Sequence, residues 1–159
     1  MPIDGGRSWR GRRIFGDNKT WRGFAVMVPA TGLAFLLVSQ VVERFFGGVE
    51  AAGLWRLESW QYLLLGLWTG FFFMACELPN SFLKRQLGVA PGGTPARPWA
   101  KVLTFVFDRF DSLIGLLGSA AVFVATPWQL WVILLVGGSF VHWLFSVLLY
   151  AFGVKKRPA

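Results

Sequence analysis

The sequence predicts an all-α integral membrane protein, a polytopic bundle of about four transmembrane helices with polar cytoplasmic loops. Hydrophobic residues make up 55% of the chain and aromatic residues 17%, more than a typical soluble domain contains. The apolar residues form long blocks rather than the alternating pattern of an outer-membrane barrel. Because lipid offers no hydrogen-bond partners, the backbone of such blocks must be satisfied within a helix. The length suits one membrane domain over residues 1–159.

The first two apolar blocks predict membrane helices at residues 24–42 and 60–78. Residues 24–42 run for 19 residues without a charge, which is enough to cross a hydrocarbon core of about 30 Å. The second block leads directly into Glu77. Ahead of them, residues 1–23 form a basic segment that we expect on the cytoplasmic side.

Two more membrane helices are predicted at residues 107–126 and 128–152. Only Pro127, which cannot continue a helix, separates them, so the second hairpin has almost no loop. Residues 79–106, between the second and third predicted helices, are expected to form a cytoplasmic loop.

The distribution of Lys and Arg predicts the orientation, because cytoplasmic segments of membrane proteins carry an excess of both. Six lie in the N-terminal segment, five between Lys84 and Arg109, and three in the C-terminal tail, whereas only two lie between the first two helices. Both termini are therefore expected in the cytoplasm, with the protein in the cell (inner) membrane. The net charge of +8 follows this pattern and lacks an interleaved aromatic surface, so we do not expect nucleic-acid binding.

Asp108 and Asp111 are candidate metal ligands at the start of the third predicted helix. Their spacing of three places both carboxylates on one helix face. Such a pair at the membrane interface is costly unless a cation compensates it. Hard oxygen ligands suit Mg²⁺, which proteins usually hold through one or two carboxylates plus substrate phosphates. The alternative is an ordinary acidic helix start that favours the helix dipole, with Arg109 as a solvated charge.

A second polar stretch follows the second predicted helix. Glu77 ends the apolar run, and the pairs Asn80 and Lys84, and Ser81 and Arg85, are each spaced by four residues. A polar face of this kind can hold a phosphate group. It can equally cover a helix that leaves the membrane, and the spacing alone does not decide between the two.

The stretch from Gly16 to Thr20, with the sequence GDNKT, has the composition of a phosphate-binding loop. Gly16 allows unusual backbone angles, Asp17 and Asn18 favour a turn, and Lys19 supplies a cation. The stretch is not a Walker A motif, because GxxxxGK[ST] is absent. The alternative, a polybasic anchor for acidic lipid headgroups, explains the neighbouring Arg residues but not the Gly-Asp-Asn sequence.

Taken together, these stretches resemble the CDP-archaeol synthase family, relatives of the CDP-diacylglycerol synthases. The resemblance rests on PIDGGRSWRGRRIFGDNKTWRGF (Pro2–Phe24), ELPNSFLKRQLGVAPG (Glu77–Gly92), FDRFDSLIG (Phe107–Gly115) and the C-terminal HWLFSVLLYAFGVKKRP (His142–Pro158). Members of the family usually carry another membrane helix before the PIDGG stretch, so the resemblance leads us to expect five spans where this sequence shows four.

The resemblance implies a cytidylyltransferase that uses CTP, a membrane lipid phosphate and Mg²⁺ to make a CDP-activated lipid and pyrophosphate for phospholipid biosynthesis. It implies catalytic roles for Asp108, Asp111 and Lys19, with the two aspartates also holding the metal. Its expected substrate-binding residues are Gly16, Asp17, Asn18, Thr20, Arg22, Glu77, Asn80, Ser81, Lys84, Arg85 and Arg109.

Two other functions are compatible with the sequence. A CDP-alcohol phosphotransferase also combines membrane helices with Asp and Mg²⁺, but this chain has only the initial DG of that family's motif. An inactive relative, a non-enzymatic membrane scaffold or a small transporter would carry glycine-rich spans such as these. It would not bind CTP, and it would tolerate an Asp108→Asn substitution. The oligomeric state is left open.

Overall fold

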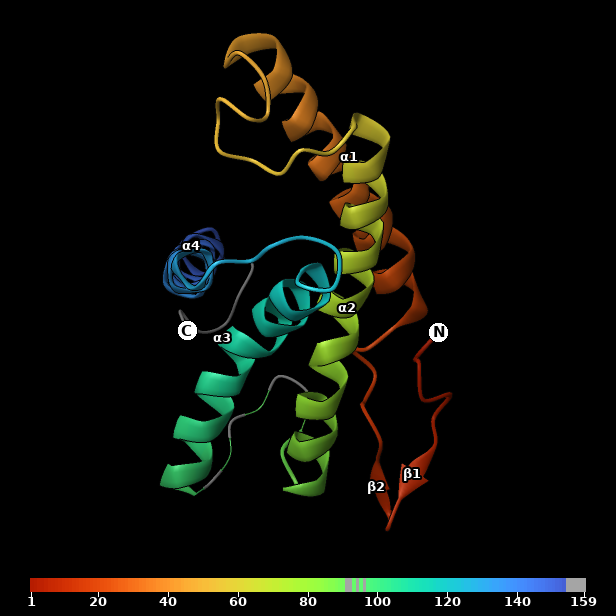
Figure 1. Cartoon of the computed structure of the whole chain (residues 1–159). Coiled ribbons are helices and arrows are strands. Elements are labelled where there is room, and N and C mark those ends of the chain that lie inside the picture. Colours follow the sequence, from red (N-terminus) through yellow and green to blue (C-terminus); the bar gives the residue numbers. More distant parts are fainter. Residues whose placement is uncertain (91–92, 94, 96, 154–159) are drawn as a thin grey trace. The chain divides into compact units, whose positions relative to one another are not determined.

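The structure is a computed structural model that describes residues 1–90, 93, 95 and 97–153, apart from the side chains of Arg109 and His142. Its elements, in order, are β1 (Ser8–Trp9), β2 (Arg12–Arg13), α1 (Trp21–Phe45), α2 (Ser59–Gln86), α3 (Pro98–Ala120) and α4 (Trp128–Ala151). Met1–Ala125 form one compact unit that holds β1, β2 and the first three helices (Figure 1). A second unit begins at Thr126 and contains α4.

Three helices in the described part of the chain, α1, α2 and α4, are long and apolar enough to cross a membrane. The predicted class of helical membrane protein is therefore confirmed. The helix α3 is not among the three, although a fourth span was predicted at residues 107–126. The physical reason is charge, because Asp108, Arg109 and Asp111 all lie in the middle of α3.

The helices are longer than the predicted spans, and the predicted loop at residues 79–106 is mostly helical. The helix α2 continues through Pro79 to Gln86, and α3 already begins at Pro98. Proline costs a helix one backbone hydrogen bond, but Asn80 directly afterwards bonds to side chains of α3 and so fixes this part of α2. A proline in the first turn suits a helix start, because its missing N–H group needs no partner there.

A small hairpin precedes α1 and was not predicted. The strands β1 and β2 pair antiparallel, with Trp9 opposite Arg12. The two residues between them, Arg10 and Gly11, have φ angles of 50° and 77°. Two consecutive positive φ angles match the tight two-residue turns that join antiparallel strands. Strands of two residues leave no alternating pattern in the sequence from which they could be recognised.

The helix α2 packs against α1 and α3 through glycines that allow close backbone approach. A Cβ atom added to Gly66 of α2 would lie 2.8 Å from the Cα atom of Gly32 in α1. A Cβ atom added to Gly115 of α3 would lie 2.6 Å from the Cβ atom of Cys76 in α2. Neither position has room for a side chain, so glycine sets both helix contacts.

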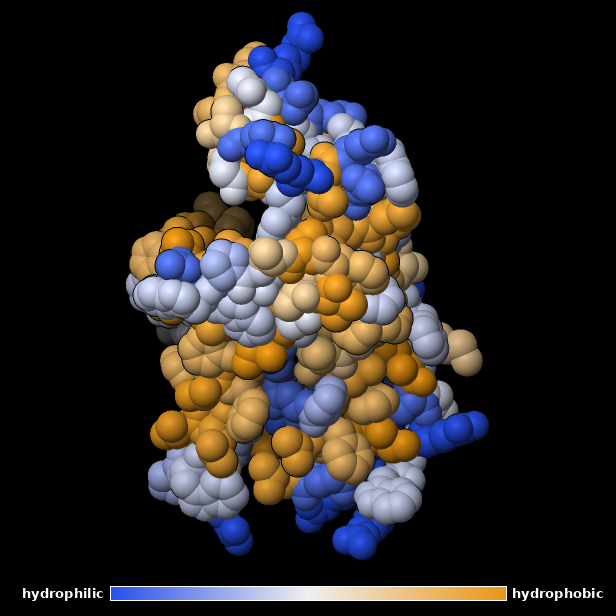
Figure 2. Space-filling model, in the orientation of Figure 1, coloured by the Kyte–Doolittle hydropathy of each residue, from blue (hydrophilic) through white to orange (hydrophobic). Residues whose placement is uncertain are grey.

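Large apolar side chains cover the outer faces of these helices. Leu37 of α1, Phe71 of α2 and Val102 of α3 are 57%, 46% and 64% exposed. Figure 2 shows the resulting hydrophobic surface over the helices, with hydrophilic residues at the end where the hairpin lies and in a patch between α2 and α3. A lipid environment accounts for the exposed apolar faces. The hydrophilic patch needs a separate explanation.

Candidate functional site

Seven polar side chains from the N-terminal segment, α2 and α3 form one connected cluster, which we call the polar network: Lys19, Glu77, Asn80, Lys84, Asp108, Asp111 and Ser112. Its centre is Asn80, whose Nδ2 group donates to Asp108 Oδ1 at 2.6 Å and to Asp111 Oδ2 at 2.9 Å. Ser112 donates to Glu77 Oε1 at 2.9 Å. Three stretches that are far apart in the sequence therefore meet at one place.

Two lysines neutralise two of the three carboxylates in this network. Lys84 forms an ion pair with Asp108, and Lys19 forms one with Glu77. The lysine side chains are only 22% and 18% exposed for Lys19 and Lys84, so water screens these pairs less than it screens a surface pair. Asp111 differs, because its hydrogen-bond partners among the described residues, Asn80 and Ser112, are neutral.

The loop that carries Lys19 is a tight turn. The amide of Lys19 donates to the carbonyl of Gly16, which places Asp17 and Asn18 at the centre of the turn. Gly16 has a φ of 93°, a conformation that side chains disfavour. The turn predicted from GDNKT is confirmed, and Thr20 next to it caps α1 by accepting a hydrogen bond from the amide of Gly23.

Asp4 stabilises this loop through hydrogen bonds to its backbone. Its carboxylate is fully buried and accepts hydrogen bonds from the amides of Gly6, Phe15 and Gly16 and from the Arg13 guanidinium. Burial by itself disfavours the charged form, but the Arg13 guanidinium and the three amides outweigh it and hold the pKa of Asp4 well below its usual range. Asp4 therefore fixes the backbone from which Lys19 reaches Glu77.

Arg85 is a buried cation with no ion-pair partner among the described residues. It is only 9% exposed, and its Nε and Nη1 groups have no hydrogen-bond partner among the described residues. Buried polar groups are rarely left in this condition, since each costs about 1–3 kcal/mol when unpaired. Ser81, one turn earlier on the same face of α2, is buried as well. An anion that binds here would satisfy the guanidinium.

Comparisons with known proteins identify the family. The model of the CDP-archaeol synthase family, described as CarS-like, matches residues 1–158. The chain belongs to the CDP-archaeol synthase family. Curated proteins called CDP-archaeol synthase from Thermococcus gammatolerans and Halorubrum lacusprofundi are each 33% identical over 158 residues, which cover 99% of this chain and 81% and 83% of theirs. One from Methanosphaerula palustris is 33% identical over 159 residues, which cover 99% of this chain and 89% of its own. No solved structure matches.

Membership of the CDP-archaeol synthase family confirms the predicted enzyme class, a CTP-dependent lipid cytidylyltransferase of phospholipid biosynthesis. It favours this class over the two alternatives, a CDP-alcohol phosphotransferase and a non-enzymatic membrane protein. About a fifth of the length of the Thermococcus gammatolerans protein lies outside the matched region.

Several residues predicted to bind substrate in this CDP-archaeol synthase family member lie outside the polar network. Asp17 is exposed and forms an ion pair with Arg13 at 2.9 Å. Asn18 and Arg22 are exposed as well. The side chain of Arg109 lies outside the described residues. The structure thus joins α2 and α3 at the predicted acidic and basic positions and leaves Asp17 and Asn18 of the turn on the surface.

Two polar residues of the site were not predicted to act in it. Asp4 organises the loop around Gly16, and Ser112 links Glu77 to Asp111. The sequence does carry a signal for Asp4, because an Asp followed by two glycines is typical of a turn in which the carboxylate bonds to nearby amides. Nothing in the spacing of Ser112 distinguishes it from any other serine of a membrane helix.

The family's expected Mg²⁺ can be tested against the residues present. Within the described part of the chain, no group of three or more His, Cys, Asp or Glu side chains is placed to hold a metal alone. Asp108 and Asp111, however, both contact the same Asn80 nitrogen and so face a common position. Two carboxylates fit a Mg²⁺ that receives its remaining ligands from phosphates and water.

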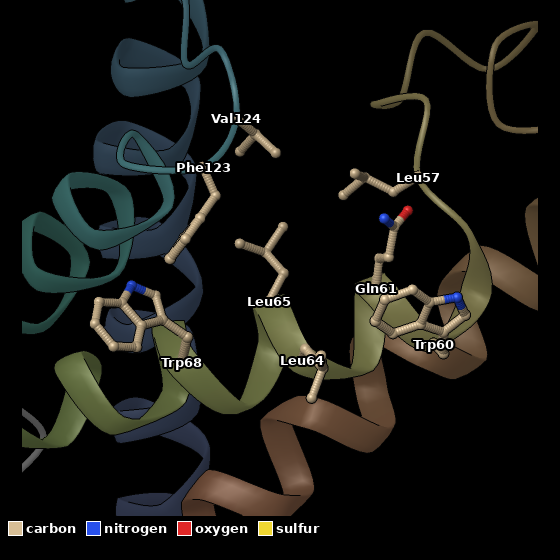
Figure 3. Close-up of a pocket in the computed structure, with 8 residues that line it drawn as sticks. All are labelled: Leu57, Trp60, Gln61, Leu64, Leu65, Trp68, Phe123 and Val124. Atoms are coloured by element: carbon tan, nitrogen blue, oxygen red, sulfur yellow. The ribbon is translucent and has the colours of Figure 1, made fainter.

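Apolar hollows adjoin the network along α2. One, of about 270 Å³, lies between α2 and α3 and includes Cys76, which directly precedes the network residue Glu77, and Gly115, which lies one turn after Asp111. A second, of about 460 Å³, lies toward the N-terminal end of α2, where Trp68 and Phe123 form one wall (Figure 3). Trp68 lines both hollows, so the two adjoin one another.

Proposed function

We propose that this chain transfers the cytidylyl group of CTP to the terminal phosphate of a membrane lipid at the polar network. The observation that supports this best is a pair of unmatched charges at one end of α2. Asp111 has no ion-pair partner among the described side chains, and the buried Arg85 has no acceptor. A nucleotide triphosphate that arrives with a divalent cation supplies an opposite charge for each.

In this proposal, Asp108 and Asp111 hold Mg²⁺, and Lys19, Lys84 and Arg85 bind phosphate oxygens. The metal, when bound, neutralises phosphate charge and orients the transferred group. Each lysine ammonium has three N–H donors and already spends some of them on a carboxylate, so a phosphate oxygen can share the same ammonium. The carboxylates thereby position the lysines as well as neutralise them.

The reaction needs no strong base from the protein. An oxygen of the lipid phosphate attacks the α-phosphorus of CTP, the bond to the β-phosphate oxygen breaks, and pyrophosphate leaves. A phosphomonoester is already largely ionised near neutral pH, so its oxygen is a competent nucleophile. Catalysis then consists mainly of positioning and charge stabilisation, which a rigid network of ion pairs provides.

We further propose that the hydrocarbon chains of the lipid lie against the hollows of α2 and α3 while the phosphate reaches the network. The hollow beside Cys76 and Gly115 adjoins the network at Glu77, and it shares Trp68 with the hollow of Figure 3. The name of the curated relatives specifies archaeol, so an ether-linked isoprenoid lipid phosphate is the first substrate to test. The excess of Lys and Arg near this end of the unit supports a cytoplasmic orientation of the network.

Pyrophosphate release from CTP by the purified protein in mild detergent tests the proposal. The assay contains Mg²⁺ and either an archaeol-type lipid phosphate or phosphatidic acid, and it compares the Asp108→Asn variant with Glu50→Gln, which removes a carboxylate from the loop between α1 and α2. We expect turnover with one lipid, a loss of about a hundredfold or more in Asp108→Asn, and no loss in Glu50→Gln.

Helical content and gel-filtration behaviour must match between the two variants for the comparison to count. Turnover that survives Asp108→Asn in folded protein would contradict the assigned role of this carboxylate. Absence of both turnover and CTP binding with either lipid would contradict the proposed function as a whole.

A further inference from the structure

The structure contains a second cationic site, on the other side of α2 from the polar network. A hollow of about 500 Å³, which we call the hairpin hollow, is lined by Trp9, Arg10, Arg12, Phe82 and Gln86. Gln86 follows Lys84 by two residues, which is about 200° around an α-helix, so the two side chains leave nearly opposite faces of α2. Figure 1 accordingly shows the hairpin and α3 on different sides of α2.

Two of the three arginines of the hairpin form no ion pair with any described residue. Arg13 is neutralised by Asp4 and Asp17. No salt bridge is found for Arg10 or Arg12 among the described residues, and Arg12 donates only to the backbone carbonyl of Gln86. The side-chain Nε2 group of Gln86 is buried and has no hydrogen-bond partner in the described part of the chain. The hollow thus offers unused donors and no acceptor charge.

The backbone at Arg10 is unfavourable for an arginine. Its φ of 50° makes it the one residue other than glycine with a positive φ in the described chain. Asn or Gly would occupy this turn position with less strain. A strained residue persists where its side chain is needed, and here the side chain lines the hollow.

Exposed tryptophans lie at the hairpin hollow and beside it. Trp9 is 56% exposed, and Trp99 at the start of α3 is 51% exposed. Trp99 and Arg97 line a neighbouring hollow of about 310 Å³ that shares Arg12 and Gln86 with the hairpin hollow. Exposed Trp beside Arg is typical of the headgroup level of a bilayer, where one part of the ring is in contact with apolar chains and the other with water.

From these observations we propose that the hairpin hollow binds the phosphate of an anionic phospholipid headgroup of the surrounding bilayer. The guanidinium groups of Arg10 and Arg12 and the Gln86 amide donate to the phosphate oxygens, and Trp9 and Phe82 contact the adjoining glycerol and chains. Guanidinium groups match phosphate geometry through paired N–H donors. The site holds a structural lipid and is separate from the place of cytidylyl transfer, so it does not depend on the proposed function.

The test measures lipid binding by the full chain in an uncharged detergent, for example by native mass spectrometry. The probe is a short-chain phosphatidylglycerol, a phosphodiester that lacks the terminal phosphate of a cytidylyl acceptor. Short-chain phosphatidylcholine and inorganic phosphate serve as comparison ligands. Three variants are compared with the unmodified protein: Arg12→Gln, Arg10→Asn, and the matched control Arg7→Gln, which removes an exposed charge outside the hollow.

We expect phosphatidylglycerol to bind more tightly than either comparison ligand, and Arg12→Gln and Arg10→Asn each to weaken it by about fivefold or more. Arg7→Gln should change its affinity by less than about twofold, because Arg7 does not line the hollow and salt screens the interaction between exposed charges. Arg10→Asn relieves backbone strain in the turn, so this variant should lose binding without losing stability. It keeps the test valid if Arg12→Gln does not fold.

Equal losses in Arg7→Gln and Arg10→Asn would overturn the proposal in favour of a diffuse electrostatic effect. Equal binding of phosphatidylcholine would show that the headgroup charge is not recognised. Competition by inorganic phosphate at the concentration of the lipid would show that a free anion occupies the hollow.

Discussion

Replacing Gly115 by Ala should uncouple α3 from α2 immediately next to the polar network. The added Cβ atom would lie 2.6 Å from both the Cβ and Sγ atoms of Cys76 and 2.7 Å from the carbonyl oxygen of Phe72. Ordinary contact between carbon atoms needs about 3.5 Å, so the helices must separate locally by about 1 Å. The carbonyl of Phe72 belongs to the backbone of α2 and cannot rotate away.

Two consequences follow from that displacement. Overpacking of this kind costs about 1–3 kcal/mol of unfolding free energy. Because Asp111 lies one turn before Gly115 and Glu77 directly after Cys76, the network is displaced with the helix contact, and a misplacement of about 1 Å can lower turnover about a hundredfold. Unfolding in a mild detergent measures the first effect, and pyrophosphate release from CTP measures the second.

Gly118 provides the matched control on the same helix. A Cβ atom added there meets no atom within 4 Å. Gly118→Ala should therefore leave the contact between α2 and α3 intact and raise stability by about 0.5–1 kcal/mol, because alanine loses less backbone entropy in a helix than glycine does. If Gly115→Ala retains normal turnover and stability, or if Gly118→Ala is equally harmful, the argument from close helix approach is refuted.

Two further predictions concern the N-terminal segment. Ionised Asp4 stabilises the loop above the ordinary carboxyl pKa of about 4, and because its folded pKa is lowered, that contribution is lost as the pH falls below 4. As the pH falls through this range, amide hydrogen exchange of Phe15 and Gly16, corrected for intrinsic rates, should become faster in the unmodified chain but change little in Asp4→Asn. Exchange that is independent of pH in both proteins would contradict this prediction. Thr20→Ala should cost about 1 kcal/mol in thermal unfolding through loss of the α1 cap, and Thr20→Ser should restore most of it; equal stability of all three proteins would exclude a capping role.

The sequence was sufficient to predict the membrane class and the meeting of the acidic and basic stretches. Uncharged blocks such as residues 24–42 have one stable arrangement in lipid, and the spacing of Asp108 and Asp111 fixes a common helix face. The bounds of the helices were harder to predict from the sequence. The predicted loop began at residue 79, but the bond from Asn80 to α3 is a tertiary contact that local sequence does not reveal.

The structure of the site depends on contacts between distant segments in the same way. Lys19 had a cationic role in the sequence interpretation, but its partner Glu77 is 58 residues away. The burial of Arg85 also results from tertiary packing, because a basic residue four positions after a serine is commonly solvated. Local patterns thus identified the groups that carry the chemistry, whereas the pairing of those groups required the fold.

One short part of α2 supports both sites that we propose. Asn80 and Lys84 face the network, whereas Phe82 and Gln86 face the hairpin hollow, because alternate residues of a helix point in nearly opposite directions. The two sites share no lining residue, so changes at one should combine additively with changes at the other. A variant of the hairpin hollow should therefore lose phosphatidylglycerol without losing cytidylyl transfer in detergent, and a variant of the network should do the reverse. Non-additive loss in a combined variant would mean that lipid bound at the hairpin also holds α2 in place for the reaction.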